Sequence, residues 1–194
     1  MGDSDAVQET APRRRYTTRT IMIAAALGAA VGVVLVPVLF AIMTAAAPMP
    51  ALAGFTFGLW SMAALVPLAV LRRGGTGVIG AVAAGVVTMV SPAGPAMLMM
   101  MAMFGLLIEL PFLVTRYRWF GLKMLLVSGV VLGALSCLLS VFTYDLPNMQ
   151  PLLLTLVCAG QLVSAAAGGA LSWLIARALR RAGIGGASAQ GANA

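Results

Sequence analysis

The chain of 194 residues is 61% hydrophobic and only 9% charged, and its mean hydropathy is +1.03. This composition excludes a soluble globular domain, and recurring apolar stretches of about 20 residues indicate a polytopic membrane protein. The net charge is +7, but the basic residues fall in short groups between the apolar stretches, which is typical of orientation charges and argues against a nucleic-acid-binding surface.

Six apolar segments follow one another along the chain, and each is predicted to be a membrane-spanning helix. They cover about residues 20–43, 55–71, 76–90, 96–115, 122–143 and 151–176. A basic cytoplasmic tail precedes them over 1–19, and a Gly/Ala/Ser-rich tail over 182–194 is predicted to be disordered. The sequence therefore predicts an all-α bundle of six transmembrane helices within residues 20–181.

The positive charges predict the orientation of this bundle. All 12 Lys and Arg residues lie in the N-terminal tail or after the second, fourth and sixth segments, and the other three connections have none. Loops that keep Lys and Arg usually face the cytoplasm. Both termini of this multi-pass cell-membrane protein are therefore expected to be cytoplasmic.

The inventory of reactive side chains argues against an enzyme. The chain has no histidine and no Cys-x-x-Cys motif, which excludes a zinc site and a His-based catalytic triad. Cys137 and Cys158 lie in apolar runs, where a free cysteine behaves as a small hydrophobe. The methionine-rich run 97–103 is interpreted as adaptable packing, so neither a metal nor another cofactor is expected.

Glu109 is the residue of the fourth segment that most needs an explanation. It stands in the sequence FGLLIELPF, at membrane depth and without a Lys or Arg at a similar depth. Ionisable residues in such places usually face the bundle interior and mark a ligand or ion path. A structural, protonated and hydrogen-bonded acid is the alternative, and Pro111 could free a backbone carbonyl near Leu107 as its partner.

Other polar and aromatic residues are candidates for the same ligand site. Gln161 and Trp60 lie inside apolar segments, where an amide and an indole ring can hydrogen-bond and stack. Tyr144, Asp145 and Asn148 gather in the connection between the fifth and sixth segments. Ordinary turn chemistry explains these three residues equally well.

Small residues recur every four positions in the first and the last segment. In the first segment Ala24, Gly28 and Gly32 form one strip, and Ala25 and Ala29 lie beside it. In the last segment the recurring residues are Gly160, Ser164, Gly168 and Ser172. Such spacing lets another helix approach closely, either inside the bundle or from a separate membrane subunit, for which the first segment is the better candidate.

The chain resembles the substrate-binding S components of energy-coupling-factor (ECF) vitamin transporters, and within them the YkoE-like type assigned to thiamine or its hydroxymethylpyrimidine precursor. The resemblance rests on the Ala-rich start RTIMIAAALGAAVGVVLV and on the stretches FTFGLWSMAALVPLAVLRRGGTGVIGAVAAGVVTMV, MFGLLIELPFLVTRYRWFGL and GGALSWLIARALRRAGI. It extends over about residues 19–184. The first outer connection, TAAAPMPALAG, departs from the Trp-rich pattern of that type.

This resemblance implies a non-enzymatic subunit that captures a vitamin-like molecule outside and docks on a membrane coupling protein driven by two cytoplasmic ATPases. It implies docking through the Ala-rich face of the first helix, and Glu109 matches an acid of the fourth span. A proton-coupled carrier of small solutes and a non-transporting scaffold subunit are the alternatives.

Overall fold

The computed structural model describes residues 17–45, 54–143 and 151–184, and these residues form helices with no strand among them. The helices are α1 (Thr18–Ala45), α3 (Phe57–Leu71), α4 (Thr76–Thr88), α5 (Ala96–Val114), α6 (Leu122–Thr143) and α7 (Pro151–Arg181). Each coincides with one predicted segment. The largest difference is at the end of α7, which continues to Arg181 because no helix breaker follows Ala176.

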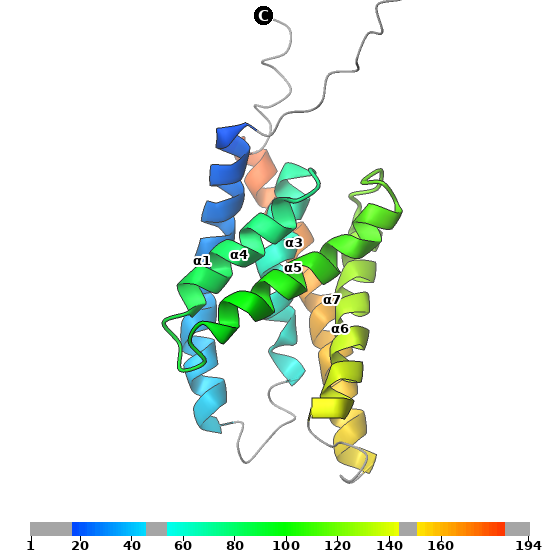
Figure 1. The fold of residues 1–194 in the computed structure, drawn as a ribbon. Coiled ribbons are helices and arrows are strands. Elements are labelled where there is room, and N and C mark those ends of the chain that lie inside the picture. Colours follow the sequence, from blue (N-terminus) through cyan, green and yellow to red (C-terminus); the bar gives the residue numbers. More distant parts are fainter. Residues whose placement is uncertain (1–16, 46–53, 144–150, 185–194) are drawn as a thin grey trace, which may run out of the picture.

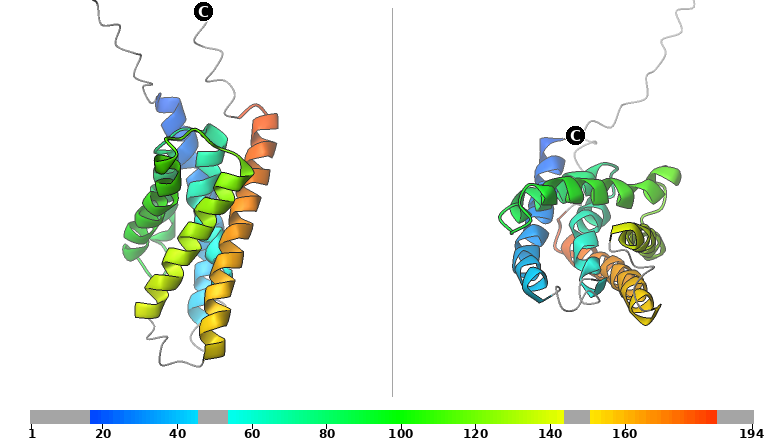
Figure 2. Two further views of the ribbon diagram at one scale, coloured as in Figure 1. Left: turned by 90° about the vertical axis from the view of Figure 1, so that its right-hand side faces the viewer. Right: turned by 60° about the horizontal axis from the view of Figure 1, so that its bottom comes forward.

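Helix α3 occupies the middle of the bundle (Figure 1). It contacts α1, α4, α5, α6 and α7, and every residue from Trp60 to Val70 is buried. Helices α1 and α4 pack on one side of it, α6 and α7 form an antiparallel pair on the other, and α5 crosses obliquely (Figure 2). Its continuous apolar sequence is buried by other helices on all sides.

Glycines bring the helix backbones into direct contact. A Cβ atom added to Gly28 of α1 would lie 2.0 Å from the carbonyl oxygen of Gly80 in α4. One added to Gly58 of α3 would lie 2.0 Å from the carbonyl oxygen of Ser164 in α7. Lipid supplies no hydrophobic drive between helices, so such close approach is a main source of packing energy in a membrane.

Four of the helices are long and apolar enough to cross a membrane: α1, α5, α6 and α7. Helices α3 and α4 are apolar but shorter, with 15 and 13 residues. At 1.5 Å per residue α4 is about 20 Å long, against about 30 Å for a hydrocarbon core. That all six helices cross the bilayer, with both termini in the cytoplasm, stays a prediction.

The basic residues of the described part gather at one end of the bundle. The start of α1, the α3–α4 turn, the α5–α6 connection and the end of α7 all lie at the upper end in Figure 1. These segments contain Arg19, Arg72, Arg73, Arg116, Arg118, Lys123, Arg177, Arg180 and Arg181. We refer to this end as the basic end of the bundle.

Candidate functional site

Glu109 lies on α5 and binds the first turn of α4. Its Oε1 accepts hydrogen bonds from the backbone N–H groups of Gly77 (2.8 Å) and Val78 (3.1 Å), and its Oε2 accepts one from Gly75 (2.8 Å). The side chain is only 3% exposed. No side chain of the preceding residues caps α4. The carboxylate of Glu109, from α5, instead accepts hydrogen bonds from the free amides of α4 and lies at the positive end of the α4 dipole.

A fourth donor completes the set around Glu109. The hydroxyl of Tyr117, in the turn after α5, donates to the same Oε2 atom at 2.9 Å. A carboxylate has about four acceptor positions, and three of the four donors are amides that cannot accept a proton in return. Both oxygens of Glu109 therefore have hydrogen-bond partners within the protein, as the structural alternative offered by the sequence requires. A role of Glu109 in ligand binding stays a prediction.

Trp60 belongs to an aromatic cluster between α3 and α5. Its ring lies 6.4 Å from that of Phe57 in a stacked arrangement and 6.1 Å from that of Phe104 at an angle of 60°. Phe57 and Phe104 also meet edge to face at 5.4 Å. Trp60 is only 9% exposed, and its Nε1–H finds no acceptor among the described residues. A buried indole N–H usually has a partner, so this atom is a candidate ligand contact.

Gln161 lies on α7, toward the end of the bundle opposite the basic end. Its side chain is 6% exposed and passes close to Gly54, where an added Cβ atom would lie 3.6 Å from its Cγ. Trp60 and Gln161 therefore both lie toward the far end of the packed pair α3 and α7. Glu109 lies beside the middle of α3, because a Cβ atom added to Gly77 would lie 2.9 Å from its Oε1 and 3.2 Å from the carbonyl oxygen of Ala64.

Two further hydroxyls in α6 share the features of a binding site. Ser128 and Ser136 are buried, at 0% and 4% exposure, and their Oγ atoms have no hydrogen-bond partner within the described residues. Sequence reasoning missed both because single serines are common in apolar helices. The available signal was their spacing on the buried face of α6: each lies four residues from Leu132, and Ser128 lies three residues after Leu125. The predicted site residues Tyr144, Asp145 and Asn148 lie outside the described residues.

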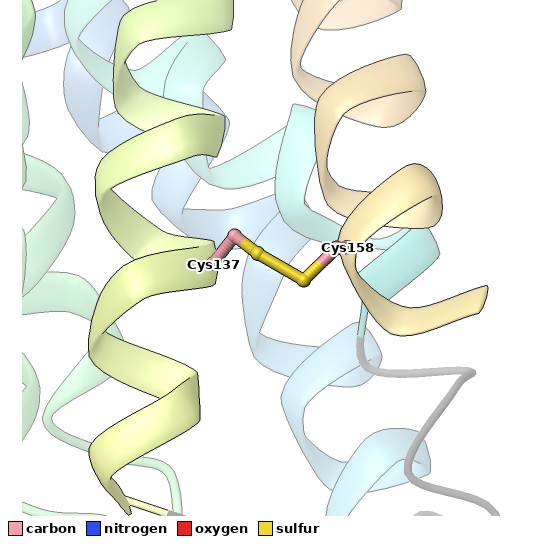
Figure 3. Close-up of a disulfide and its surroundings, with 2 residues drawn as sticks. All are labelled: Cys137 and Cys158. Atoms are coloured by element: carbon pink, nitrogen blue, oxygen red, sulfur yellow. A yellow bond between two sulfur atoms is a disulfide. The ribbon is translucent and has the colours of Figure 1, made fainter. Parts of the chain in front are cut away.

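A disulfide joins α6 to α7 near the end opposite the basic end (Figure 3). It links Cys137 and Cys158, whose Cα atoms are 5.3 Å apart. The expectation of two free, apolar cysteines was therefore wrong. The two helices run antiparallel, so the residues 21 positions apart in sequence lie level with each other.

The small-residue strips of α1 and α7 face other helices of the bundle. Gly28 and Gly32 lie against Gly80 and Ala84 of α4, and Ala24 beside them is fully buried. In α7, Ser164 Oγ accepts a hydrogen bond from the N–H of Gly58 (2.8 Å) and donates to the carbonyl of Phe55. For these residues the geometry matches internal packing. Ala25 and Ala29, which the sequence also proposed for docking, are partly exposed.

The outward side of α1 borders an apolar groove. The groove has a volume of about 260 Å³ and is formed by α1, α3 and α7. Its lining consists of Leu27, Ala30, Val31, Val34, Leu35, Leu59, Met62, Val66 and Ile175. Ala30 is exposed, and Val34 retains 55% of its accessible surface. No polar side chain lines the groove, so its surface suits a helix or another apolar partner at membrane depth.

Comparisons with known proteins relate the chain to transport systems. Residues 19–135 match the family described as the permease component of ABC-type cobalt transport systems. A crystal structure of an S-component of an ECF transporter superimposes with a TM-score of 0.80 and 21% sequence identity, covering 88% of each chain. No curated protein matches the chain. At this identity the structural likeness shows that the two chains share a fold.

Proposed function

Because the chain belongs to the family of permease components of ABC-type cobalt transport systems, we propose that it is the membrane-embedded substrate-binding S component of an ECF-type importer. The observation that carries this proposal is the S-component fold, which extends over 88% of the chain. In the proposed mechanism the subunit captures a small molecule from outside. It then delivers this cargo through a membrane coupling protein driven by two cytoplasmic ATPases, with no catalysis of its own.

The proposed cargo is an organic molecule, although the family description names cobalt. Divalent cobalt favours imidazole, carboxylate and thiolate ligands. The chain has no histidine, its two cysteines are joined in the disulfide, and the described residues hold no cluster of three potential ligands. Both oxygens of Glu109 already accept hydrogen bonds from the protein. The side-chain inventory therefore supports a cargo that aromatic rings, amides and hydroxyls recognise.

Thiamine or its hydroxymethylpyrimidine precursor is the first candidate for this cargo. Each carries an aminopyrimidine ring, and thiamine is also a cation. The Phe57–Trp60–Phe104 cluster offers aromatic faces for stacking and cation–π contact. The indole N–H of Trp60 and the amide of Gln161 offer hydrogen bonds to ring nitrogens. These groups lie toward the end of the bundle opposite the basic end. In the predicted orientation that opposite end faces outside, so a ligand from outside would enter there.

Mass spectrometry of the purified protein tests the proposal directly. An organic molecule that co-purifies at stoichiometric amounts, or raises the melting temperature within a panel of thiamine, hydroxymethylpyrimidine and related vitamins, supports the S-component assignment. A response to Co²⁺ alone would contradict the organic cargo. The absence of any bound molecule and of any shift across the panel would favour the scaffold alternative.

Trp60→Ala is expected to weaken cargo binding more than tenfold, which corresponds to about 1.4 kcal/mol. The substitution removes both the stacking face and the indole N–H. Trp60→Phe keeps a ring in the cluster and removes only the donor, so its loss is expected to be smaller. Isothermal titration with the co-purified ligand gives the affinities, and Trp119→Ala, at a site that is 71% exposed, is the matched control. Unchanged affinity in Trp60→Ala would remove Trp60 from the proposed site.

The coupling protein is proposed to dock on the apolar groove beside α1. Its wholly apolar lining and its position on the outward side of α1 support a helix of another membrane subunit as the occupant. Of the small residues of α1, the exposed Ala30 lines the groove, whereas Ala25 and Ala29 lie on another side of the helix and are not part of the lining. Ala24, Gly28 and Gly32 contribute indirectly, by holding α1 against α4.

Ala30→Trp is expected to abolish co-purification with the coupling protein and leave cargo affinity unchanged. The indole ring would fill the groove without meeting a buried neighbour, because Ala30 is exposed. Ala134→Trp places the same ring on an exposed site of α6, away from the groove, and is expected to retain the complex. Loss of the complex in both variants, or in neither, would contradict docking at the groove.

The disulfide supports the predicted orientation of the bundle. Disulfides persist in oxidising compartments outside the cytoplasm. The Cys137–Cys158 bond lies toward the end opposite the basic end. The positive-inside rule places the basic end in the cytoplasm, so the disulfide lies toward the outside. Two independent properties of the chain thus favour the same orientation, with both termini inside.

A further inference from the structure

Two turns at the basic end carry a pair of arginines each. Arg72 and Arg73 follow α3, and Arg116 and Arg118 follow α5. Arg72, Arg116 and Arg118 are exposed, and Arg73 is partly exposed. We call these four residues together with Trp119 the paired-turn surface.

Glu109 fixes the two turns to each other. A single oxygen, Oε2, accepts hydrogen bonds from the N–H of Gly75 in the first turn and from the hydroxyl of Tyr117 in the second. The turns also touch directly, since a Cβ atom on Gly74 would lie 2.7 Å from the Tyr117 ring. Tyr117 in turn stacks on Phe120, with ring centroids 6.3 Å apart. The spacing of the two arginine pairs is therefore set by the fold.

The positive charge of the paired-turn surface lacks an acidic counterpart. Glu109 is the one acidic residue in the described part of the chain, and its oxygens are already bound to amides and to Tyr117. A further guanidinium lies close by, because Arg180 reaches from α7 to the carbonyl of Ala69 and is near enough to Arg72 for their charges to repel. An external anion would relieve this repulsion.

Trp119 indicates where that anion resides. It is 71% exposed although tryptophan is costly to leave in water, and it stands directly after Arg118 in the connection between two apolar helices. Tryptophan prefers the headgroup level of a bilayer, and clusters of Lys and Arg at the ends of membrane helices attract anionic lipids. We propose that the paired-turn surface binds the headgroup of an anionic phospholipid.

The phosphate of the lipid lies between the arginine pairs, and Trp119 contacts the glycerol and upper acyl region. Arginine suits this role because its planar guanidinium donates two parallel hydrogen bonds to phosphate oxygens. The inference does not depend on the cargo. It does not depend on the orientation of the bundle either, because the lipid can be added to the protein in detergent.

Thermal unfolding of the full chain in neutral detergent tests this binding. Phosphatidylglycerol is expected to raise the melting temperature by about 5 °C or more when its concentration far exceeds Kd. Phosphatidylcholine, glycerol 3-phosphate and inorganic phosphate are expected to leave it unchanged. The double variant R116Q/R118Q should lose the response, and native mass spectrometry should show that it has lost a bound phosphatidylglycerol. The matched control R19Q/R181Q removes the same charge from exposed positions on α1 and α7 and should retain both signals.

Several results would overturn the proposal. An equal response to phosphatidylcholine would mean that the protein reacts to lipid in general. An equal response to glycerol 3-phosphate would indicate a site for free phosphate. Equal losses in R116Q/R118Q and R19Q/R181Q would mean that only net charge matters. If R116Q/R118Q is too unstable to measure, R116K/R118K replaces it. This variant keeps the positive charge but loses the planar guanidinium that donates two parallel hydrogen bonds. It must weaken lipid retention at least threefold for the proposal to stand.

Discussion

Replacing Glu109 with alanine is expected to lower the free energy of unfolding by about 4 kcal/mol and the melting temperature by about 10 °C. The substitution leaves the amides of Gly75, Gly77 and Val78 and the hydroxyl of Tyr117 without their acceptor. Hydrogen bonds to a charged group contribute about 1.5–3 kcal/mol each, and buried donors that lose their partner carry a desolvation cost. Thermal denaturation in detergent, followed by intrinsic fluorescence, measures the loss.

Two companion variants show whether the hydrogen bonds cause this loss. Glu109→Gln keeps an acceptor for Gly77 and Val78 but turns an amide NH₂ toward the N–H of Gly75, so about half of the loss is expected. Tyr117→Phe removes one bond of the set and is expected to cost about 1.5 kcal/mol. The opposite pattern, with stability unchanged in Glu109→Gln and cargo affinity reduced more than tenfold, would assign Glu109 to the ligand site instead.

Replacing Gly28 with leucine is expected to prevent α1 from packing on α4 and to cost about 3 kcal/mol or more. The first carbon of the new side chain would already lie 2.0 Å from the Gly80 carbonyl oxygen, and backbone atoms cannot move aside as the end of a flexible side chain can. The yield of folded protein after gel filtration and its melting temperature report the effect.

The neighbouring residue Ala30 provides the control for this substitution. It lies on the same helix but is exposed, so Ala30→Leu is expected to change stability by less than about 0.5 kcal/mol. A Gly28→Leu protein that folds normally but no longer binds the coupling protein would mean that this strip is a docking face rather than internal packing.

The helices of this fold could be predicted closely from the sequence because each is a long apolar run bounded by charges or by Pro and Gly. The segment predicted at 122–143 coincides with α6, and the start predicted at 76 coincides with α4. Periodicity did not reveal which small residues face which partner. Every helix of a membrane bundle is apolar on several sides, so the buried strip Ala24–Gly28–Gly32 and the exposed Ala30 look alike in sequence.

The candidate site could be predicted only in part. That Glu109 needs a partner follows from its apolar surroundings, but three of its four donors lie 31 to 34 residues earlier in the chain. Local reasoning offered a carbonyl freed by Pro111 near Leu107, because the sequence alone does not show that the first turn of α4 approaches Glu109. The disulfide was missed for a related reason: two cysteines in separate apolar runs show no spacing motif, and only the alignment of α6 with α7 brings Cys137 to Cys158.

The bonds between Glu109 and the first turn of α4 also determine where this chain tolerates changes in length. One residue inserted between Gly75 and Val78 would rotate the following amides by about 100° around the helix axis, and the carboxylate would lose several donors at once. At the other end of α4 the chain leaves through Val90 and the turn Ser91–Gly94, where Val90 is 77% exposed and Pro92 is exposed. Insertions and deletions in related chains are therefore expected to accumulate at that end of α4, while the register at Glu109 stays fixed.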